Sequence, residues 1–404
     1  MALKKNIVSC VIGLLALFLG ILVLNLNFNI DRLTEKEKCP ACFGISACPD
    51  IATNKIRLKY LDFYSFLNSL MSVKNVYSGE YNDQNVVLKK LAHQSELEDF
   101  DKLICSDPGL LELCVNKQKP RKLKTNFQKL IMNELSGGGF ADPDNKITLC
   151  PSTDGFDQLI SNTQILQSAD EKDLLKYLWT IVKINPEPLL LQILQADNNW
   201  PVPKYFGACG RTIVEEYVGL PLSSYLNEPW MRRAKIASSL LDAAYKFTFM
   251  DPKFSYYLTD ISIDNIAVNN LDQAIFVDLE NIIIVDRQPP LKDFRKLEKW
   301  NHTHKNQLDI DCQDCYVFSP IDICSHKFSD HNFYAVCQHI LGHGLGTSIH
   351  KHGFLQNPPQ DILKKYPNFS YLLEQCSIPD ISISRIDMGN QLKHVLDTMI
   401  TEVR

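Results

Sequence analysis

Three side chains in the second half of the chain combine the groups that a phosphoryl transfer needs. Asp260 and Asp278 carry carboxylates, and Asn265 lies five residues after the first and thirteen before the second. One carboxylate can orient and deprotonate an acceptor hydroxyl, while an amide oxygen and a second carboxylate can bind the metal ions that bridge nucleotide phosphates. We therefore predict Asp260 as a catalytic residue, and Asn265 and Asp278 as metal ligands.

The sequence between the last two of these residues predicts a β-hairpin. Residues 266–268 and 274–277 are short apolar runs, and the polar stretch 269–273 lies between them. Such a hairpin would bring Asn265 and Asp278 to one cleft. The spacing of the three residues also matches the catalytic-loop Asp, the metal-binding Asn and the Asp of the D-F-G turn in protein kinases. The alternative is a surface hairpin beside two acidic loops.

A second group of candidate residues lies nearer the N-terminus. Residues 85–91 are rich in β-branched and apolar side chains and predict a strand. Its Val-Val-Leu-Lys sequence fits the V-A-I-K pattern, in which the lysine contacts the α- and β-phosphates. We predict Lys89 as this catalytic and nucleotide-binding cation. Lys90 is the alternative, because a register shift of one residue reverses the face of a strand.

Three further residues are predicted to contact the nucleotide, which we expect to be ATP with Mg²⁺ or Mn²⁺. Gly79 is the one glycine in the segment where a nucleotide-covering loop is expected. Residues 205–210 and 211–219 predict two strands that lead into a hinge. At that hinge, Glu216 and Val218 would present backbone groups to the adenine.

Lys89 needs a carboxylate partner, and the sequence offers two. Glu187 begins a predicted helix that Asn185 can cap and for which Pro186 suits the first turn. Glu96 lies closer to Lys89 along the chain. We favour Glu187 as the third catalytic residue and keep Glu96 as the alternative.

The N-terminus predicts a membrane anchor. Residues 7–26 form an apolar run of 20 residues without a charge, which is long enough to cross a bilayer as a helix. Lys4 and Lys5 precede the run, so the positive-inside tendency places the N-terminus in the cytosol and the remainder in the lumen or outside the cell. No small-x-small cleavage site follows the run. We favour a retained type II signal anchor; a cleaved signal peptide, which would give a secreted protein, is the alternative.

Cysteine usage indicates the same side of the membrane. The chain has 13 Cys, and only Cys10 lies within the anchor. The remaining twelve predict up to six disulfides in an oxidising compartment. The sequons at Asn301 and Asn368 predict glycosylation there. A net charge of −5 without basic patches argues against a nucleic-acid partner.

These features predict an α+β protein with a two-lobed, protein-kinase-like fold preceded by one transmembrane helix. We expect a cytosolic tail over 1–6, the anchor over 7–26 and a Cys-containing stem over 27–55. The predicted N-lobe covers 56–216, with an insertion at about 93–180, and the predicted C-lobe covers 217–404. Residues 56–70 have the apolar spacing of a helix.

Several strings of residues, spread from position 38 to 337, carry a more specific resemblance. They are Lys-Cys-Pro-Ala-Cys-Phe-Gly at 38–44, Val-Lys-Asn-Val-Tyr at 73–77, Asn-Pro-Glu-Pro at 185–188, Lys-Tyr-Phe-Gly-Ala-Cys-Gly at 204–210 and Asp-His-Asn-Phe-Tyr-Ala-Val-Cys at 330–337. With them the chain resembles the divergent protein kinase domain family of the secretory pathway, in its "deleted in autism" branch. The resemblance implies a kinase-like fold, residence in Golgi or ER membranes, and secretion as a signalling factor.

Three departures from an ordinary kinase leave a second function open. Gly79 stands alone where several glycines are expected, Thr259 replaces the Arg before the catalytic Asp, and Leu279-Glu280 replaces Phe-Gly. The first hypothesis is a phosphotransferase with an unknown lumenal or extracellular acceptor protein. The second is a pseudokinase that acts as a secreted or membrane-anchored binding protein, with a cell-surface receptor as its partner.

Overall fold

The computed structural model describes eight stretches of the chain. They are residues 30–59, 75–114, 125–136, 146–163, 171–288, 296–300, 317–342 and 353–402. The predicted anchor at 7–26 and the sequon at Asn301 lie outside these stretches. Within them, none of the helices has the length and apolarity needed to span a membrane.

The chain divides into two compact units. Unit 1 comprises Met1–Thr125 and Phe206–Tyr217, and unit 2 comprises Asn126–Tyr205 and Val218–Arg404. The structure thus groups residues 126–205 with the C-terminal half, whereas the sequence analysis placed them in the N-lobe range 56–216.

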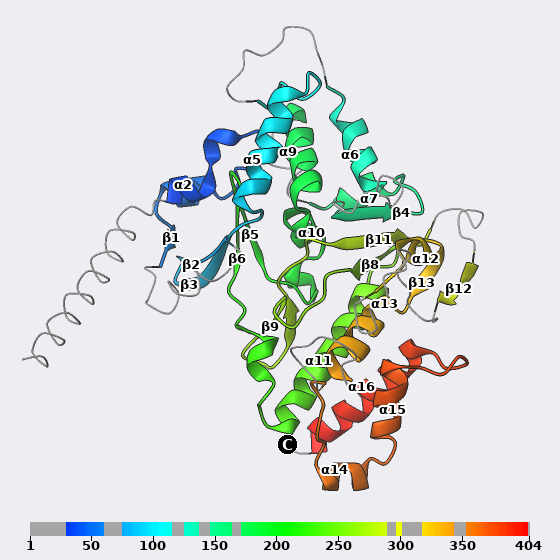
Figure 1. Ribbon diagram of the computed structural model, residues 1–404. Helices are drawn as coiled ribbons and strands as arrows, with labels where there is room; N and C mark the ends of the chain where they lie inside the picture. Colours follow the sequence, from blue (N-terminus) through cyan, green and yellow to red (C-terminus); the bar gives the residue numbers. More distant parts are fainter. Residues whose placement is uncertain are drawn as a thin grey trace, which may run out of the picture. The chain divides into compact units, whose positions relative to one another are not determined.

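Unit 1 is built on a five-stranded sheet (Figure 1). Its strands, in spatial order, are β1 (Ile56–Leu58), β2 (Asn75–Tyr81), β3 (Gln84–Lys90), β6 (Thr212–Glu216) and β5 (Tyr205–Cys209). The two-residue turn between β2 and β3 has positive φ at Asn82 and Asp83, which suits the twist of a tight hairpin. The structure forms β1 over residues 56–58, where a helical pattern was predicted. That part of the helix prediction was wrong because strand pairing with β2 overrides the local periodicity.

The predicted stem is an integral part of unit 1. Its helices α2 (Ile30–Thr34) and α3 (Cys48–Ala52) pack on one face of the sheet, against Val86 and Leu88 of β3. A disulfide joins Cys48 to Cys209 of β5. The described part of 27–55 therefore covers the sheet and is not a detached linker.

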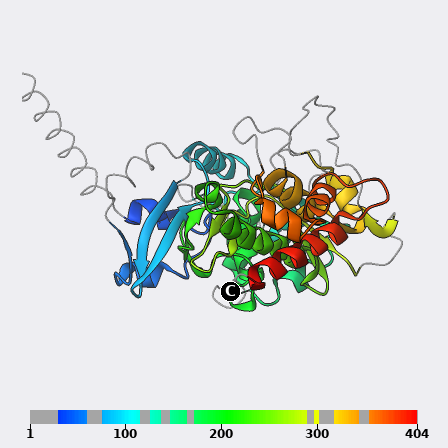
Figure 2. The same ribbon diagram turned by 90° about the horizontal axis from the view of Figure 1, so that it is seen from below.

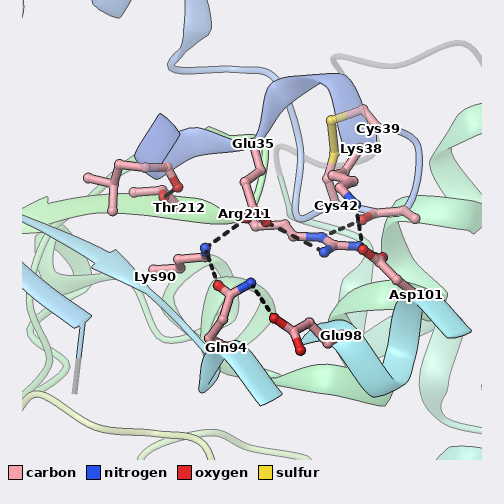
Figure 3. A network of polar contacts seen from close by, with 12 residues as sticks. Glu35, Lys38, Cys39, Cys42, Lys90, Gln94, Glu98, Asp101, Arg211 and Thr212 are labelled. Atoms are coloured by element: carbon pink, nitrogen blue, oxygen red, sulfur yellow. Dashed lines mark hydrogen bonds and ion pairs between the residues drawn. A yellow bond between two sulfur atoms is a disulfide. The ribbon is translucent and has the colours of Figure 1, made fainter. Parts of the chain in front are cut away.

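A network of charged side chains joins this N-terminal segment to the rest of unit 1 (Figure 3). The guanidinium of Arg211 is 1% exposed and pairs with Glu35 and Asp101. Lys38 lies 2.5 Å from Asp101, and Lys90 lies 2.9 Å from Glu35. Burial by itself would raise the pKa of Asp101, but the hydrogen bonds from Arg211 and Lys38 outweigh it and hold that pKa below its ordinary value.

Unit 2 contains most of the helices. They are α6 (Phe127–Leu135), α7 (Phe156–Ile160), α9 (Glu171–Ile184), α10 (Glu187–Ile193), α11 (Trp230–Phe249), α12 (Pro320–Cys324), α13 (His331–Tyr334), the π-helix η6 (Ala335–Leu341), α14 (Gln360–Lys365), α15 (Phe369–Ser377) and α16 (Arg385–Glu402). The apolar face of α11 is buried, and α16 packs against α11 and α15 (Figure 2). This helical core supports the strands that carry the candidate site.

Small sheets complete unit 2. One has the order β4 (Ile147–Cys150), β11 (Ile282–Asp286) and β8 (Phe254–Leu258), in which β11 runs parallel to β4 and antiparallel to β8. Another has the order β10 (Ala274–Phe276), β9 (Ile266–Val268) and β7 (Leu220–Pro221). A two-stranded parallel sheet pairs β12 (Lys296–Trp300) with β13 (His326–Ser329).

Disulfides occur in both units, as the cysteine count predicted. The bonds are Cys39–Cys42, Cys48–Cys209, Cys105–Cys114, Cys150–Cys324 and Cys337–Cys376. They account for ten of the twelve cysteines beyond position 10; Cys312 and Cys315 lie outside the described stretches. In unit 2, the bond from Cys150 in β4 to Cys324 in α12 fixes the predicted insertion to the C-terminal half.

Candidate functional site

The loop after β8 carries Asp260 and Asn265. Asp260 is exposed and Asn265 is half-buried. The backbone N–H of Asn265 donates to the carbonyl of Ser262 at 3.1 Å, which closes a turn. Its side-chain Nδ2 donates to the carbonyl of Asp260 at 3.2 Å. Because this contact uses the amide nitrogen, Oδ1 is the atom that Asn265 would offer to a metal.

The predicted hairpin is confirmed. Strands β9 and β10 pair antiparallel, with Ile266 opposite Phe276. One residue beyond the ladder, the N–H of Val277 donates to the carbonyl of Asn265 at 3.0 Å. This bond places Asp278 next to a residue that is hydrogen-bonded to Asn265, so the hairpin brings the two predicted metal ligands to the same end.

The loop after β10 is also tied directly to the loop after β8. The N–H of Thr259 donates to the carbonyl of Asn281 at 3.0 Å. Within the second loop, the N–H of Glu280 lies 3.4 Å from the Asp278 carboxylate. Asp260, Asn265 and Asp278 therefore lie on two hydrogen-bonded loops of unit 2; their chemical roles remain predictions.

Two buried polar residues hold the strand that leads to Asp260. Asn332 accepts a hydrogen bond from the N–H of Leu258 at 3.3 Å, and its Nδ2 donates to the carbonyl of Tyr256 at 2.9 Å. The His331 ring Nε2 lies 2.8 Å from the carbonyl of Leu258. Both side chains are at most 1% exposed. They bind the backbone of β8 much as a neighbouring strand would.

This function of His331 and Asn332 was not predicted from their sequence. Their string at 330–337 contributed only to the family resemblance. The available signal was a run of polar residues entering an apolar segment, because buried polar groups are retained where they satisfy backbone partners.

Lys89 lies in unit 1, on the face of β3 opposite Val86 and Leu88. Its Nζ is 2.7 Å from the carboxylate of Glu215, and the two side chains are 12% and 1% exposed. The strand register places Val87 opposite Glu215, so Lys89 and Glu215 are diagonal neighbours on one face. Glu215 was not among the predicted partners of Lys89, because the pairing of β3 with β6 is a long-range contact.

The two predicted partners of Lys89 have distinct settings. Glu96 lies in the first turn of α5 (Gln94–Ser106), where its carboxylate accepts the N–H of His93 at 2.7 Å in a capping box. Glu187 is the first residue of α10 in unit 2 and is 2% exposed. The role of Glu187 as an ion-pair partner, with Glu96 as the alternative, remains a prediction.

The other predicted nucleotide contacts lie in and just after the sheet of unit 1. Gly79 is buried in the middle of β2, where an added Cβ would collide with the Leu88 side chain. Close strand packing therefore accounts for this glycine without a ligand. Glu216 ends β6 and is exposed, and Val218 is half-buried in the following segment. Gly219 has φ of +154°, and a side chain there would collide with the carbonyl of Val268.

The donor atoms of Asn265 and Asp278 suit Mg²⁺ or Mn²⁺. An amide oxygen and a carboxylate are hard oxygen ligands, and Mg²⁺ is commonly held by one or two carboxylates together with substrate phosphates. Within the ranges that the structure describes, no group of three or more His, Cys, Asp and Glu side chains could hold a metal ion. Cys39, Cys42 and Cys48 are in disulfides, so their sulfurs are not thiolates that could bind a metal ion.

Comparison with known sequences places these loops in a family. The model of the family described as "Protein-kinase domain of FAM69" matches residues 178–379. A human protein named "Divergent protein kinase domain 2A" is 33% identical over 401 residues, covering 92% of this chain and 89% of the relative. The chain belongs to the divergent protein kinase domain family. It is therefore a kinase-like protein of mixed α/β structure.

Other members of the divergent protein kinase domain family match over most of their length as well. The protein of the same name from Xenopus tropicalis is 32% identical over 94% of this chain and 91% of its own length. Human "Divergent protein kinase domain 2B" is 25% identical over 97% of this chain and 90% of its own. The matched range 178–379 includes Asp260, Asn265 and Asp278. The loops after β8 and β10 that carry them therefore belong to the kinase-like domain.

One predicted glycosylation site of this divergent kinase domain lies in the described part of the chain. Asn368 precedes the first residue of α15, and both Asn368 and Ser370 are exposed. A glycan on Asn368 would therefore project into solvent, and its presence remains a prediction.

Proposed function

We propose that this protein is a metal- and ATP-dependent phosphotransferase of the secretory pathway. The observation that carries the proposal is the pair of loops in unit 2 that backbone hydrogen bonds join. These loops hold Asn265 and Asp278 at one end of a hairpin, and Asp260 is an exposed residue of the loop after β8. Asp260 would orient the acceptor hydroxyl and accept its proton.

Few protein groups are needed for this reaction. Phosphoryl transfer depends mainly on the positioning of the reactants and on neutralisation of the phosphate charge. Asn265 and Asp278 would hold the metal ion, whose charge balances the phosphates. Lys89 would add a cation beside its partner Glu215, and the backbone at Glu216 and Val218 would contact adenine; the pairing of Lys89 with Glu187 stays a prediction. This small set of groups would suffice to transfer a phosphoryl group to a hydroxyl of a lumenal or extracellular protein.

The disulfides support the proposed compartment. Five bonds occur in the described residues, in both units, and such bonds form and persist in oxidising environments. We propose a type II protein of the Golgi or ER membrane, anchored by residues 7–26, with release by cleavage as the alternative. Glycans on Asn301 and Asn368 would accord with either form.

Thermal unfolding tests the nucleotide site. We expect ATP with Mg²⁺ or Mn²⁺ to raise the melting temperature of the full chain in detergent, and ATP without metal to have little effect. At a ligand concentration 100 times Kd, the expected stabilisation is about 2.7 kcal/mol. Asp278→Ala should lose the metal-dependent rise, measured against its own melting temperature without ligand. A rise of equal size in Asp278→Ala would contradict the metal assignment.

The packing of Gly79 favours a second candidate, a pseudokinase that signals by binding a cell-surface receptor. Gly79 allows close packing of β2 on β3, and Thr259 and Glu280 replace residues that active kinases use. If binding alone matters, Asp260→Ala protein applied to responsive cells should signal as strongly as wild type. Loss of signalling by a variant that is secreted and folded normally would exclude this candidate.

A further inference from the structure

Glu280 fastens the Asp278 loop to two distant parts of unit 2. It lies two residues after Asp278, at the position where the usual D-F-G sequence has glycine. Its carboxylate Oε2 accepts a hydrogen bond from Nδ2 of Asn185 at 3.1 Å. The same oxygen lies 3.7 Å from Nζ of Lys146. A glycine at this position could make neither contact.

Asn185 is itself held in a fixed orientation. Its side chain is buried, with 2% exposed, in the residue pair that precedes α10. Its Oδ1 accepts the N–H of Glu187 at 2.9 Å, so the oxygen end of the amide faces the helix. The nitrogen end must then face Glu280. The start of α10 therefore determines where the Glu280 carboxylate is held.

Lys146 supports the same loop through its side chain and its backbone. It immediately precedes β4, and its carbonyl accepts the N–H of Ile282 at 3.0 Å. One residue thus binds the chain by its backbone at Ile282 and by its charge at Glu280. The side chains of Lys146 and Glu280 are only 21% and 27% exposed, so solvent screens their attraction less than at an open surface.

We propose that Glu280 is a positioning residue for the metal ligand Asp278, and that Lys146 and Asn185 hold it. The proposal rests on the proposed metal-dependent function. Side chains and backbone secure the loop on both sides of Asn281: Glu280 is held through Asn185 and Lys146, and Ile282 through the Lys146 carbonyl. Lys146, which lies within the predicted insertion at about 93–180, thereby helps to support the proposed metal site.

Binding of Mn²⁺ in the presence of a non-hydrolysable ATP analogue tests this role. Electron paramagnetic resonance measures free Mn²⁺ and gives Kd for the full-chain protein in detergent. We expect Glu280→Ala to weaken Mn²⁺ binding by about tenfold or more, as loss of an outer-shell partner does at other metal sites. Glu280→Gln keeps an acceptor for Asn185 but loses the charge opposite Lys146, so its Kd should lie between those of the wild type and Glu280→Ala.

Glu134→Ala is the matched control. Glu134 pairs with Lys183 at 3.2 Å in the same unit, with side chains 25% and 32% exposed, and has no contact with the Asp278 loop among the described interactions. Its loss should leave Kd for Mn²⁺ unchanged. A purely structural role for Glu280 would lower the melting temperature without changing Kd, because Kd reports on the folded protein.

The outcomes separate the inference from the proposed function. Wild-type affinity in Glu280→Ala, with no binding in Asp278→Ala, would overturn the inference alone. No Mn²⁺ binding by the wild type would overturn the proposed function and the inference with it. If Glu280→Ala does not fold, Lys146→Met replaces it, and weaker binding is again expected. Unchanged affinity in folded Lys146→Met would reject the role of this ion pair.

Discussion

The two units hold their functional candidates in different ways. In unit 1, largely buried cations contact carboxylates: Arg211 contacts Glu35 and Asp101, and Lys89 contacts Glu215. In unit 2, backbone hydrogen bonds fix two loops, and Asp260 is an exposed residue of the first. A reacting group must reach its substrate, whereas a structural charge is best compensated within the fold. Proton transfer should therefore depend on the loops of unit 2, and the buried Arg211 of unit 1 should serve stability.

The largest expected effect is on turnover. Asp260→Asn removes the proton acceptor, so kcat should fall by about 10²–10⁴-fold with the folded state intact. Transfer of labelled phosphate and a melting curve measure the two quantities. Asp264→Asn is the control, because Asp264 is an exposed carboxylate of the same loop that bonds to Ser223. Equal losses in both variants would show that this loop needs acidity in general and that Asp260 has no special role.

The next effect concerns stability in unit 1. Arg211→Ala removes a cation that is 1% exposed from beside Glu35 and Asp101, which keep Lys90 and Lys38 as partners, and the loss of its charged hydrogen bonds should cost about 1.5–3 kcal/mol. Urea unfolding measures the change. The control is Lys204→Ala, whose ion pair with Asp197 is well exposed and should contribute at most about 1 kcal/mol. Similar costs for both variants would remove the distinction between buried and exposed charges.

A residue of unit 2 should affect both properties. Asn332→Leu has a similar size but leaves the N–H of Leu258 and the carbonyl of Tyr256 without this partner, at a cost of about 1–3 kcal/mol each. We expect faster hydrogen exchange at Leu258 and a lower kcat. Asn332→Asp keeps the acceptor for Leu258 and should protect that amide better. Unchanged exchange in Asn332→Leu would show that β8 holds its position without Asn332.

The smallest effect is a dependence on pH. The pKa of Asp101 is lower in the folded chain than its ordinary value of 3.8, so its contribution to stability is present above that value and is lost as pH falls through the folded pKa. Melting temperature should therefore decline less steeply at acid pH in Asp101→Asn than in the wild type. Both proteins would be compared between pH 6 and pH 3. Parallel declines would assign the acid sensitivity to other carboxylates.

Local sequence signals sufficed for the kinase-like character and for the hairpin. Asn265, the two apolar runs and Asp278 are close along the chain, so spacing and alternation report their arrangement directly. The identification of a kinase-like domain of mixed α/β structure is likewise confirmed.

Local sequence signals did not predict the pairing of strands and charges that are far apart along the chain. Residues 56–58 have helical spacing yet pair with β2, and β4 pairs with β11 across more than 130 residues of chain (147 to 282). The Lys89–Glu215 pair likewise depends on the register of β3 against β6. Periodicity describes one segment at a time. It cannot show which distant strand will pair with a sheet edge, or which distant residue will pair with a charged side chain.

The N-terminal cover of unit 1 limits where the chain can be cut. A truncation at residue 56, the start of the predicted N-lobe, would remove Leu33, Ala47 and Ile51 from the apolar face that includes Val86 and Leu88. It would also leave Cys209 as a reactive thiol without Cys48. A protease that releases the protein would therefore have to cut before Ile30. The junction of a recombinant fusion would also have to lie before Ile30, so that the apolar face stays covered.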